Sequence, residues 1–562
     1  MAIDVTTIGD LADRGAERSP DRDAIVFPDV ALTSAQLRER SEAYARSLAG
    51  LGVGAGDKVG ILMANRAEFV LAVFGAAKLG AVVVPINGRF KAHELSHVVG
   101  HGDVRVLLTA AGDGRGATDY VALIAQMLPE LAGQDPRALA LDGLPELRCI
   151  VDVDADRVPA HPGFLARADF EAAAAAVPAE EVRRRQERVR VRDVAILMYT
   201  SGTSARPKGC LLTHEALVRH GANVARTRFE LTEADSFWDP LPLFHIGGIV
   251  PMLGCLATGA TYCHAGHFDP EVALRTLQER RCRVIYPAFE TIWLAVLDHP
   301  RFATTDLGAI ELIQSIAVPE RLAQLEERMP WAAQVSSYGA TECSSNLTLS
   351  RADDPYEARI GTLGHPLPGL EIKIVDPATG AVRPAGEVGE LCFRGYSLFE
   401  GYHKDPELTA ASFDADGFFH SQDLALLDAD GRLVYAGRLK DMLKVGGENV
   451  SALELEGYLL GHPAVNIAQV VAAPDARYDE VPAAFVQLKP GATLTEAELI
   501  GFCVGQIATY KVPRYVRVVD DWPMSGTKIQ KFVLRERIAE ELRAAGIAQA
   551  PRVEALTDAA AR

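Results

Sequence analysis

The sequence lacks the cysteine and charge patterns that mark a zinc finger, a disulfide-rich protein or a nucleic-acid binder. None of its 8 cysteines forms a Cys-x-x-Cys pair, so we expect neither a zinc site nor a disulfide framework, and a reducing cytoplasm fits best. Basic residues are outnumbered, with 57 Lys and Arg against 75 Asp and Glu and a formal net charge of −18. This balance argues against nucleic acid or an anionic membrane as a partner. An acidic protein that binds an anion must gather its positive charge locally.

Charged residues are absent from one internal stretch, residues 240–268. A hydropathy window could score it as membrane-spanning, but its Pro, Gly and His content and its polar ends favour a buried strand, loop and helix. The first 20 residues are polar and acidic and do not resemble a secretory signal. We therefore expect neither a membrane span nor a signal peptide.

The chain has 562 residues, 48% of them hydrophobic, which is enough for more than one domain. The apolar runs KVGILM, AVVVPI and VRVLLTA alternate with helical patterns, which predicts an α/β fold of parallel-type sheets covered by helices. An Ala-rich stretch, residues 170–190, predicts one surface helix, and closely spaced glycines around residues 383–401 predict a β-rich subdomain. We expect a large N-terminal domain, residues 1–439, and a small α+β C-terminal domain, residues 440–562, that ends in a loosely held tail.

The stretch YTSGTSARPKG, from Tyr199 to Gly209, directly follows a short apolar run that predicts a buried strand. Ligands bind at the carboxyl ends of strands in open α/β sheets, and backbone N–H groups, hydroxyls and a lysine suit a phosphate chain. The residue order differs from that of a Walker loop. Taken alone, the stretch is equally compatible with a solvated turn.

Four further segments carry polar side chains. LPLFHIGG and SSYGATE are expected to form short turns, HSQDLALLDADGRLVYAGRLKD places Asp423 and Arg438 on either side of a hairpin, and PMSGTKIQK places Lys528 close to the C-terminus. Together with the loop, in this order and spacing, they resemble the adenylate-forming superfamily of acyl-CoA synthetases, adenylation domains and luciferases, over nearly the whole chain. The resemblance implies ATP-dependent activation of a carboxylic acid as acyl-AMP, followed by transfer to the thiol of coenzyme A. It implies ATP, Mg²⁺ and coenzyme A as the small molecules involved.

The resemblance also assigns an ATP site. Its residues would be Thr200, Ser201, Gly202, Thr203, Ser204, Lys208, Ala317, Val318, Pro319, Ser337, Tyr338, Gly339, Ala340, Thr341, Asp423, Tyr435, Arg438 and Asn449. Glu342 would hold Mg²⁺ with help from Thr200, because Mg²⁺ prefers hard oxygen ligands. Tyr338 would stack on adenine, and Asp423 with Arg438 would bind the ribose. The alternatives are a surface carboxylate for Glu342, a core tyrosine for Tyr338 and an exposed ion pair for Asp423 and Arg438.

Two residues are assigned catalytic roles by the resemblance. Lys528 would bridge the attacking carboxylate and the α-phosphate, which repel each other. The family usually has a glycine directly before this lysine, whereas this chain has Thr527, and Lys531 is a rival. His245 would orient the acyl carboxylate, with a buried structural histidine as the alternative.

A second set of residues would serve thioester formation. In the family the C-terminal domain rotates about a hinge, which corresponds here to Lys440, and withdraws the catalytic lysine. The rotation would bring Lys444, Gly446 and Gly447 to coenzyme A and Asn449 to the nucleotide or acyl group. Glycine allows backbone to lie close to the pantetheine arm.

The walls of the acyl pocket would be Phe237, His245, Ile246, Gly247, Pro287, Phe289, Ile313, Gly339 and Cys343. They are mainly apolar and include no Arg or Lys for a second carboxylate, so an aliphatic, alicyclic or aromatic monoacid is favoured. The family commonly has a glycine followed by Ala-Pro or Glu-Pro where this chain has Ala317 and Val318 before Pro319. The added side-chain volume leaves the substrate size open. Three alternatives remain: a ligase that loads a carrier protein, a luciferase-like oxygenase, and a non-catalytic nucleotide or acyl sensor. Many family members are dimers, so a homodimer is one alternative for the oligomeric state.

Overall fold

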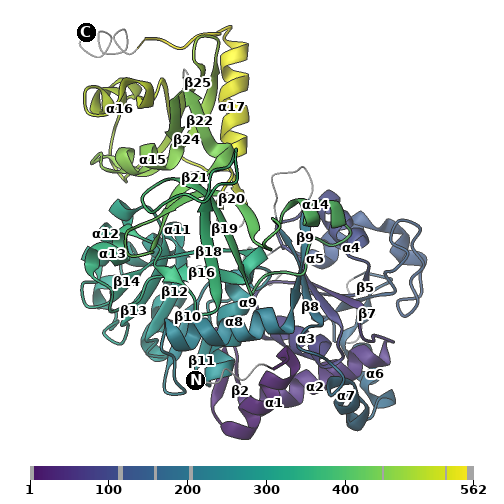
Figure 1. Ribbon diagram of the computed structural model, residues 1–562. Helices are drawn as coiled ribbons and strands as arrows, with labels where there is room; N and C mark the ends of the chain where they lie inside the picture. Colours follow the sequence, from purple (N-terminus) through teal and green to yellow (C-terminus); the bar gives the residue numbers. More distant parts are fainter. Residues whose placement is uncertain are drawn as a thin grey trace.

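The fold is seen in a computed structural model, which describes residues 6–111, 118–156, 161–200, 207–445, 448–525 and 528–552. Two seven-stranded sheets form the N-terminal part (Figure 1). The first has the order β7 (Leu165–Ala166), β6 (Cys149–Asp152), β5 (Val104–Thr109), β3 (Lys58–Leu62), β4 (Val82–Pro85), β8 (Val194–Thr200) and β9 (Lys208–Thr213). Only β9 pairs antiparallel in this sheet, so the prediction of parallel strands is confirmed.

The second sheet has the order β14 (Ala333–Val335), β13 (Leu312–Ile316), β12 (Val284–Phe289), β10 (Ser236–Asp239), β11 (Thr261–His264), β1 (Asp23–Val26) and β2 (Ala31–Thr33). It is parallel except for the pair β1–β2. The helices of this part of the chain are α1 (Ile8–Arg18), α2 (Ser34–Gly50), α3 (Ala67–Lys78), α4 (Ala92–His101), α5 (Tyr120–Met127), α6 (Arg167–Ala173), α7 (Ala179–Gln186), α8 (His214–Thr227), α9 (Ile246–Thr258), α10 (Pro270–Glu279), α11 (Glu290–Leu297), α12 (Pro319–Arg328), α13 (Tyr356–Gly361) and α14 (Pro406–Ala411).

Helices α8 and α9 pack on each other between the two sheets, α8 against β8 and β9 and α9 against β10 and β11. Their backbones meet at two glycines: a Cβ at Gly254 would lie 2.6 Å from the carbonyl oxygen of Gly221. The stretch without charge therefore forms a buried helix and strand, as predicted. No helix among the described residues is long and apolar enough to cross a membrane.

The Ala-rich stretch is not one helix, which corrects the prediction from the sequence. Helix α6 ends at Ala173, a 3₁₀ turn follows, and α7 starts only after Pro178. Proline disfavours the helical conformation in the residue before it, and Val177 is extended, with φ −121° and ψ 111°. The chain direction therefore changes at this proline.

The predicted β-rich subdomain consists of two antiparallel sheets near the centre of the molecule (Figure 1). One contains β15 (Ser337–Ala340), β16 (Ser345–Leu349) and β17 (His365–Pro366). The other contains β18 (Leu370–Val375), β19 (Gly389–Gly395), β20 (Phe419–Leu427) and β21 (Leu433–Arg438).

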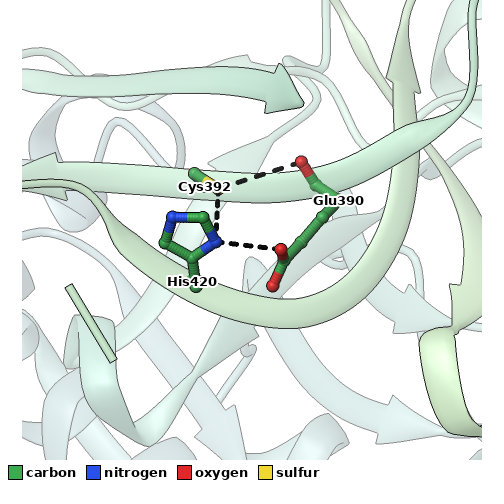
Figure 2. A group of neighbouring side chains, drawn as sticks. All are labelled: Glu390, Cys392 and His420. Atoms are coloured by element: carbon green, nitrogen blue, oxygen red, sulfur yellow. Dashed lines mark hydrogen bonds and ion pairs between the residues drawn. The ribbon is translucent and has the colours of Figure 1, made fainter. Parts of the chain in front are cut away.

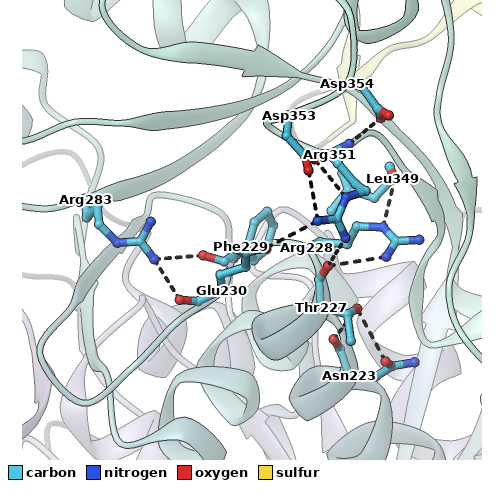
Figure 3. A network of polar contacts seen from close by, with 10 residues as sticks. All are labelled: Asn223, Thr227, Arg228, Phe229, Glu230, Arg283, Leu349, Arg351, Asp353 and Asp354. Carbon is cyan, nitrogen blue, oxygen red and sulfur yellow. Dashed lines mark hydrogen bonds and ion pairs between the residues drawn. The ribbon is translucent and has the colours of Figure 1, made fainter.

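Arginines tie the small sheet of β15–β17 to the C-terminal end of α8 (Figure 3). Arg228 Nε donates to the carbonyl of Leu349 at 3.0 Å, at the end of β16. Arg283 donates to the carbonyl of Phe229 at 2.8 Å, and Arg351 to that of Thr227 at 3.4 Å. Carbonyls at a helix C-terminus lack helical partners and carry partial negative charge, so guanidinium groups stabilise them. This network holds the strands that carry the predicted SSYGATE turn.

The C-terminal part has a sheet and a core of its own. The sheet contains β23 (Glu448–Ser451), β22 (Met442–Val445), β25 (Asp479–Leu488) and β24 (Val465–Asp475), and β26 (Tyr515–Val518) also pairs with β25. Its helices are α15 (Ala452–Leu460), α16 (Glu496–Cys503) and α17 (Lys531–Ala544), and β27 (Met524–Ser525) pairs with β28 (Lys528–Ile529). The α+β prediction is confirmed, whereas α17 and the β22–β23 hairpin were not predicted.

We expect protonation of buried histidines to destabilise the fold in acid, with His264 as the clearest case. Its Nδ1 accepts from the backbone N–H of Gly266 at 2.8 Å, so its Nε2 must donate to the carbonyl of Leu241 at 2.8 Å. Burial lowers the pKa of His264 from 6.5 to about 4. Because the folded pKa is the lower one, the unfolded chain binds more protons, and stability falls as the pH drops from 6.5 towards 4. By pH 5 the loss should reach about 2 kcal/mol from this residue.

Urea titrations of the wild type and His264→Gln at pH 7.5 and pH 5 measure this effect. The variant should be less stable at pH 7.5 but should lose less stability between the two values, and exposed His267→Gln should behave like the wild type. An unchanged pH dependence in His264→Gln would contradict the assignment.

Candidate active site

One cavity of about 240 Å³ lies where several separated segments meet. Ten residues predicted for the ATP, metal and acyl sites line it: Thr200, Lys208, His245, Tyr338, Gly339, Ala340, Thr341, Glu342, Asp423 and Arg438. They come from the first large sheet and from both small ones, and His245 comes from the loop before α9. The fold thus gathers around one space side chains that are up to 238 residues apart, from Thr200 to Arg438.

The phosphate-loop prediction lies at the edge of the first sheet. Thr200 ends β8 and Lys208 begins β9, and the two residues face each other in the antiparallel pair. Ser201, Gly202, Thr203 and Ser204 lie outside the described residues. Lys208 Nζ lies 5.5 Å from the ring centre of Tyr402, and both Lys208 and Thr200 line the cavity. A cation is therefore present where the sequence predicts phosphates.

Glu342 is held by a residue that the sequence did not predict. The hydroxyl of Tyr402 donates to Glu342 Oε1 at 3.0 Å. Tyr402 reaches this position because residues 400–403 run along β9, with Leu211 N–H donating to the Gly401 carbonyl at 3.0 Å. Glu342 is half-buried on the cavity wall, so it is not an isolated surface carboxylate. The segment around Tyr402 has no spacing signal, and only its pairing with β9 reveals its place.

Asp423 and Arg438 are cross-strand partners on β20 and β21. Arg438 Nε lies 3.2 Å from Asp423 Oδ1, and the side chains are 48% and 11% exposed. The hydroxyl of Tyr338 donates to Asp423 Oδ2 at 2.6 Å. Burial, and then the negative charge of Asp423, raise the pKa of Tyr338, so the phenol remains a donor. The ion pair is therefore partly buried and joined to Tyr338, not a free surface pair.

Tyr338 combines a ring and a hydroxyl with separable roles. Tyr338→Phe should lower the free energy of unfolding by about 1–2 kcal/mol, because the Asp423 carboxylate loses one donor but keeps Arg438. It should change the KM for ATP by less than about tenfold, whereas Tyr338→Ala should raise that KM by more, because it also removes the ring that would stack on adenine. ATP titrations of both variants, with thermal melts, measure the two effects. A Phe variant as impaired in ATP binding as the Ala variant would refute the separation.

His245 precedes α9, and its side chain is exposed on the cavity wall. This position excludes the alternative of a buried structural histidine. His245 is one of two predicted acyl-wall residues on this cavity, together with Gly339.

The other predicted acyl-wall residues are not on the wall of the main cavity. Phe237 and Ile313 are fully buried with 0% exposure, and Phe237 lines a second, small apolar hollow between α8 and α9. Neither cavity is lined by Ile246, Gly247, Pro287, Phe289 or Cys343. The main hydrophobic core contains the side chains of Phe237, Ile246, Ile313 and Cys343, and Phe289 packs against it.

Several predicted ATP-site residues also lie behind or beside the cavity wall. Ser337 is buried and accepts from Gln314 at 2.8 Å and from Asn346 at 2.9 Å. The ring of Tyr435 lies 6.1 Å from that of Tyr338. Val318 packs against the C-terminal core. Ala317 is half-buried and Pro319 is exposed at the start of α12, and neither lines the cavity.

The residues predicted for the second reaction step are less fully described. Lys444 is exposed on β22, and its backbone N–H donates to Glu480 at 2.9 Å. Gly446 and Gly447 lie outside the described residues, as do the side chains of Lys440, Asn449 and Lys528.

The cavity wall includes further residues that the sequence did not predict: Asn87, Phe90, Met198, Tyr199, Phe244, Tyr402, Leu408, Ser412, Phe419, His420, Ser421 and Gln422. Most have no motif of their own, because ordinary strand or loop residues become wall residues only through packing. His420 to Gln422 could have been found by their nearness to Asp423 in the sequence.

A cavity whose wall combines Lys208, Glu342 and an Asp423–Arg438 pair is a polar ligand site of an α/β enzyme and fits a nucleotide. Comparison with protein families agrees: the AMP-binding enzyme family matches residues 12–403, and the AMP-binding enzyme C-terminal domain matches residues 454–528. The chain belongs to the AMP-binding enzyme family.

Relatives match along almost the full chain. YngI of Bacillus subtilis, whose name assigns it to the acyl-CoA synthetases, is 37% identical over 95% of this chain and 97% of its own length. The human mitochondrial medium-chain acyl-CoA ligase ACSF2 is 30% identical over 95% of this chain and 88% of its own. The crystal structure of the anthranilate CoA ligase AuaEII with anthranoyl-AMP aligns with a TM-score of 0.82 at 27% identity, covering 97% of this chain and 99% of that one. The protein is thus an AMP-forming acid–thiol ligase that uses ATP and coenzyme A.

Proposed function

We propose that this acyl-CoA ligase activates a mainly apolar monocarboxylic acid as acyl-AMP and transfers the acyl group to coenzyme A. The observation that carries the proposal is the single cavity shared by Thr200, Lys208, Glu342, Asp423 and Arg438. A carboxylate is a poor electrophile until one oxygen becomes part of a good leaving group. Nucleotidyl transfer needs positioning and charge neutralisation more than covalent help, and these residues supply both.

Each wall residue has a task that follows from its place. Lys208 neutralises phosphate charge beside the loop that starts at Thr200, whose residues up to Ser204 are proposed to wrap the β- and γ-phosphates. Asp423 accepts hydrogen bonds from the ribose hydroxyls, with Arg438 beside it. His245, exposed at the N-terminal end of α9, orients the acid carboxylate.

Lys528 is proposed to join this site from the C-terminal part. Acid and α-phosphate are both negative, so their approach needs a cation between them. A lysine on a flexible stem can follow the charge as it moves to pyrophosphate.

The donor set at Glu342 fits Mg²⁺. Glu342 and Thr200 line the same cavity, and a carboxylate and a hydroxyl are both hard oxygen ligands. When bound, Mg²⁺ would neutralise charge on the phosphates. Tyr402 orients Glu342 through its 3.0 Å hydrogen bond and so keeps the carboxylate facing the cavity.

The charges on the cavity wall support a monoacid. Its lysine and arginine are Lys208 and Arg438, which are taken by the phosphates and the ribose in this proposal. A second carboxylate on the acid would therefore lack a cationic partner among the described wall residues. The apolar residues from Phe237 to Cys343 that were predicted as acyl walls remain proposed for the far end of the acid.

We further propose a domain boundary between residues 439 and 440, with Lys440 as the hinge. It follows β21 and precedes the separate C-terminal sheet. Rotation there would exchange Lys528 for Lys444, Gly446, Gly447 and Asn449 at the site, which opens a path for the pantetheine thiol. A homodimer and a cytoplasmic location remain proposals from the family resemblance; the free thiols of all eight cysteines suit a reducing compartment.

Pyrophosphate release with a panel of acids tests the function. Aliphatic, alicyclic and aromatic monoacids should support release with ATP and Mg²⁺, and matched dicarboxylic acids should not. Adding coenzyme A should then yield an acyl thioester, whereas a phosphopantetheinyl carrier protein should accept little. If no acid supports pyrophosphate release, the proposed function is wrong. If the carrier protein is loaded in preference to coenzyme A, the carrier protein is the acceptor.

A further inference from the structure

We propose that Glu390, Cys392 and His420 form a binding site for Zn²⁺ beside the active-site cavity (Figure 2). Each residue offers one ligand atom, and these atoms all lie within 4.8 Å of one another. Among the described residues this group of His, Cys and carboxylate ligands is the one that meets this spacing. A carboxylate oxygen, a thiolate and an imidazole nitrogen are the ligand types that Zn²⁺ takes.

The site results from strand pairing and not from sequence spacing. Glu390 and Cys392 are two residues apart on β19, so their side chains share one face of the sheet. Cys392 faces His420 across the β19–β20 pair. A Cys-x-x-Cys search cannot find such a set, because its third member comes from another strand.

The distances approach those of a tetrahedral site. With Zn–N and Zn–O bonds of about 2.0–2.1 Å and a Zn–S bond of about 2.3 Å, tetrahedral angles place nitrogen about 3.6 Å from sulfur and about 3.4 Å from oxygen. In the structure His420 Nδ1 lies 3.5 Å from Cys392 Sγ and 2.9 Å from Glu390 Oε2. The thiol and imidazole are thus already spaced for a shared ion, and the carboxylate needs to retreat by about 0.5 Å.

A supporting shell is present around the ligands. The other ring nitrogen of His420, Nε2, lies 3.8 Å from Asp414 Oδ2, and Lys373 Nζ pairs with that carboxylate at 2.6 Å. Metal-binding histidines usually direct their free N–H to a carboxylate, and Asp414 is the carboxylate near Nε2 that a small shift would bring within hydrogen-bond distance. Glu390 Oε1 accepts from the backbone N–H of Gln422 at 3.0 Å, which fixes the carboxylate and leaves Oε2 for the ion.

The net charge of the proposed site and its access from the cavity are compatible with Zn²⁺ binding. On binding, the Cys392 thiol releases its proton to solvent. His420 Nδ1 gives up the proton that it donates to Glu390, and the imidazole then carries one proton on Nε2, facing Asp414. Zn²⁺ with one carboxylate and one thiolate is then neutral, which suits a buried position. Cys392 is 0% exposed, but the His420 side chain is 30% exposed and lines the cavity, so an ion can arrive from there.

Occupation of the site should slow the ligase. His420 and Asp423 lie on the same strand, separated by Ser421 and by Gln422, whose backbone N–H donates to Glu390. Withdrawing Glu390 Oε2 and His420 towards an ion changes the wall next to the ribose position. This inhibitory effect rests on the proposed function, whereas the binding itself does not.

Cobalt titration of chelator-treated, full-length protein tests the binding, since a thiolate ligand gives Co²⁺ a sulfur-to-metal absorption band in the near ultraviolet. The wild type should show the band with roughly one equivalent bound and lose it when Zn²⁺ displaces cobalt. Cys392→Ser should abolish the band, and the matched variant Cys149→Ser, another buried thiol, should retain it. His420→Gln should weaken Zn²⁺ binding at least about tenfold. This variant tests the site if Cys392→Ser does not fold.

No band in the wild type, or the same band in folded Cys392→Ser, would overturn the site. For the inhibitory effect, micromolar Zn²⁺ should reduce pyrophosphate release in the wild type and much less in Cys392→Ser, each measured against its own zinc-free rate. If the protein has no ligase activity, the proposed function is wrong and the zinc inhibition cannot be measured. The cobalt titration would still test the binding site.

Discussion

Lys528→Ala should slow acyl-adenylate formation by about 10²–10³-fold, the effect of removing one preorganised positive group from a transition state. Before displacement, two anions must approach to contact distance, and afterwards charge moves to the leaving pyrophosphate. Thioester formation from supplied acyl-AMP should be nearly unchanged, because the lysine is proposed to leave the site before that step. Pyrophosphate release and acyl transfer from synthetic acyl-AMP measure the two half-reactions separately.

Lys531→Ala is the matched control for this prediction. Lys531 Nζ lies 2.6 Å from Glu456 Oε1, and Glu456 is 4% exposed. Breaking a buried pair leaves an uncompensated charge, so this variant should lower the melting temperature and not slow adenylation selectively. Adenylation at the wild-type rate in Lys528→Ala, or a selective adenylation defect in folded Lys531→Ala, would move the catalytic role to another residue.

Glu342→Gln should reduce pyrophosphate release by about 10²–10³-fold at limiting Mg²⁺. The amide keeps the size of the side chain but removes the negative charge that a hard cation requires. Part of the loss should be recovered at high Mg²⁺, because weakened binding is offset by mass action. Rates measured over a Mg²⁺ titration separate weaker metal binding from a lower maximal rate.

Tyr402→Phe is the companion variant for Glu342. It keeps the ring that lies beside Lys208 and removes only the hydroxyl that donates to Glu342. One lost hydrogen bond to a charged group corresponds to about 1.5–3 kcal/mol, so we expect the rate of pyrophosphate release to decrease about ten- to a hundredfold.

A Glu342→Gln enzyme with the same Mg²⁺ dependence as the wild type would exclude Glu342 as a metal ligand.

The motif residues of the site were easier to predict from the sequence than the other residues of the cavity wall. Asp423, Arg438, Glu342 and Lys208 were predicted because they lie in the motifs that carry the resemblance to the adenylate-forming superfamily. Tyr402 was not predicted, because its place beside β9 depends on pairing between segments that are remote in sequence. The Ala-rich helix was predicted across Pro178 because its helix propensity was weighed above the proline.

The sequence by itself determined the alternation of apolar strands and amphipathic helices, the family resemblance and the charged residues of the site, since these depend on residue type and local order. Tertiary structure alone decided which of them share a wall. The pairing of residues 400–403 with β9 brought a hydroxyl to Glu342, and the β19–β20 register placed a thiol opposite an imidazole. Contacts of this kind arise from packing between distant segments. Burial of apolar surface determines how the sheets pack, and this packing in turn determines the positions of the polar groups at the sheet edges.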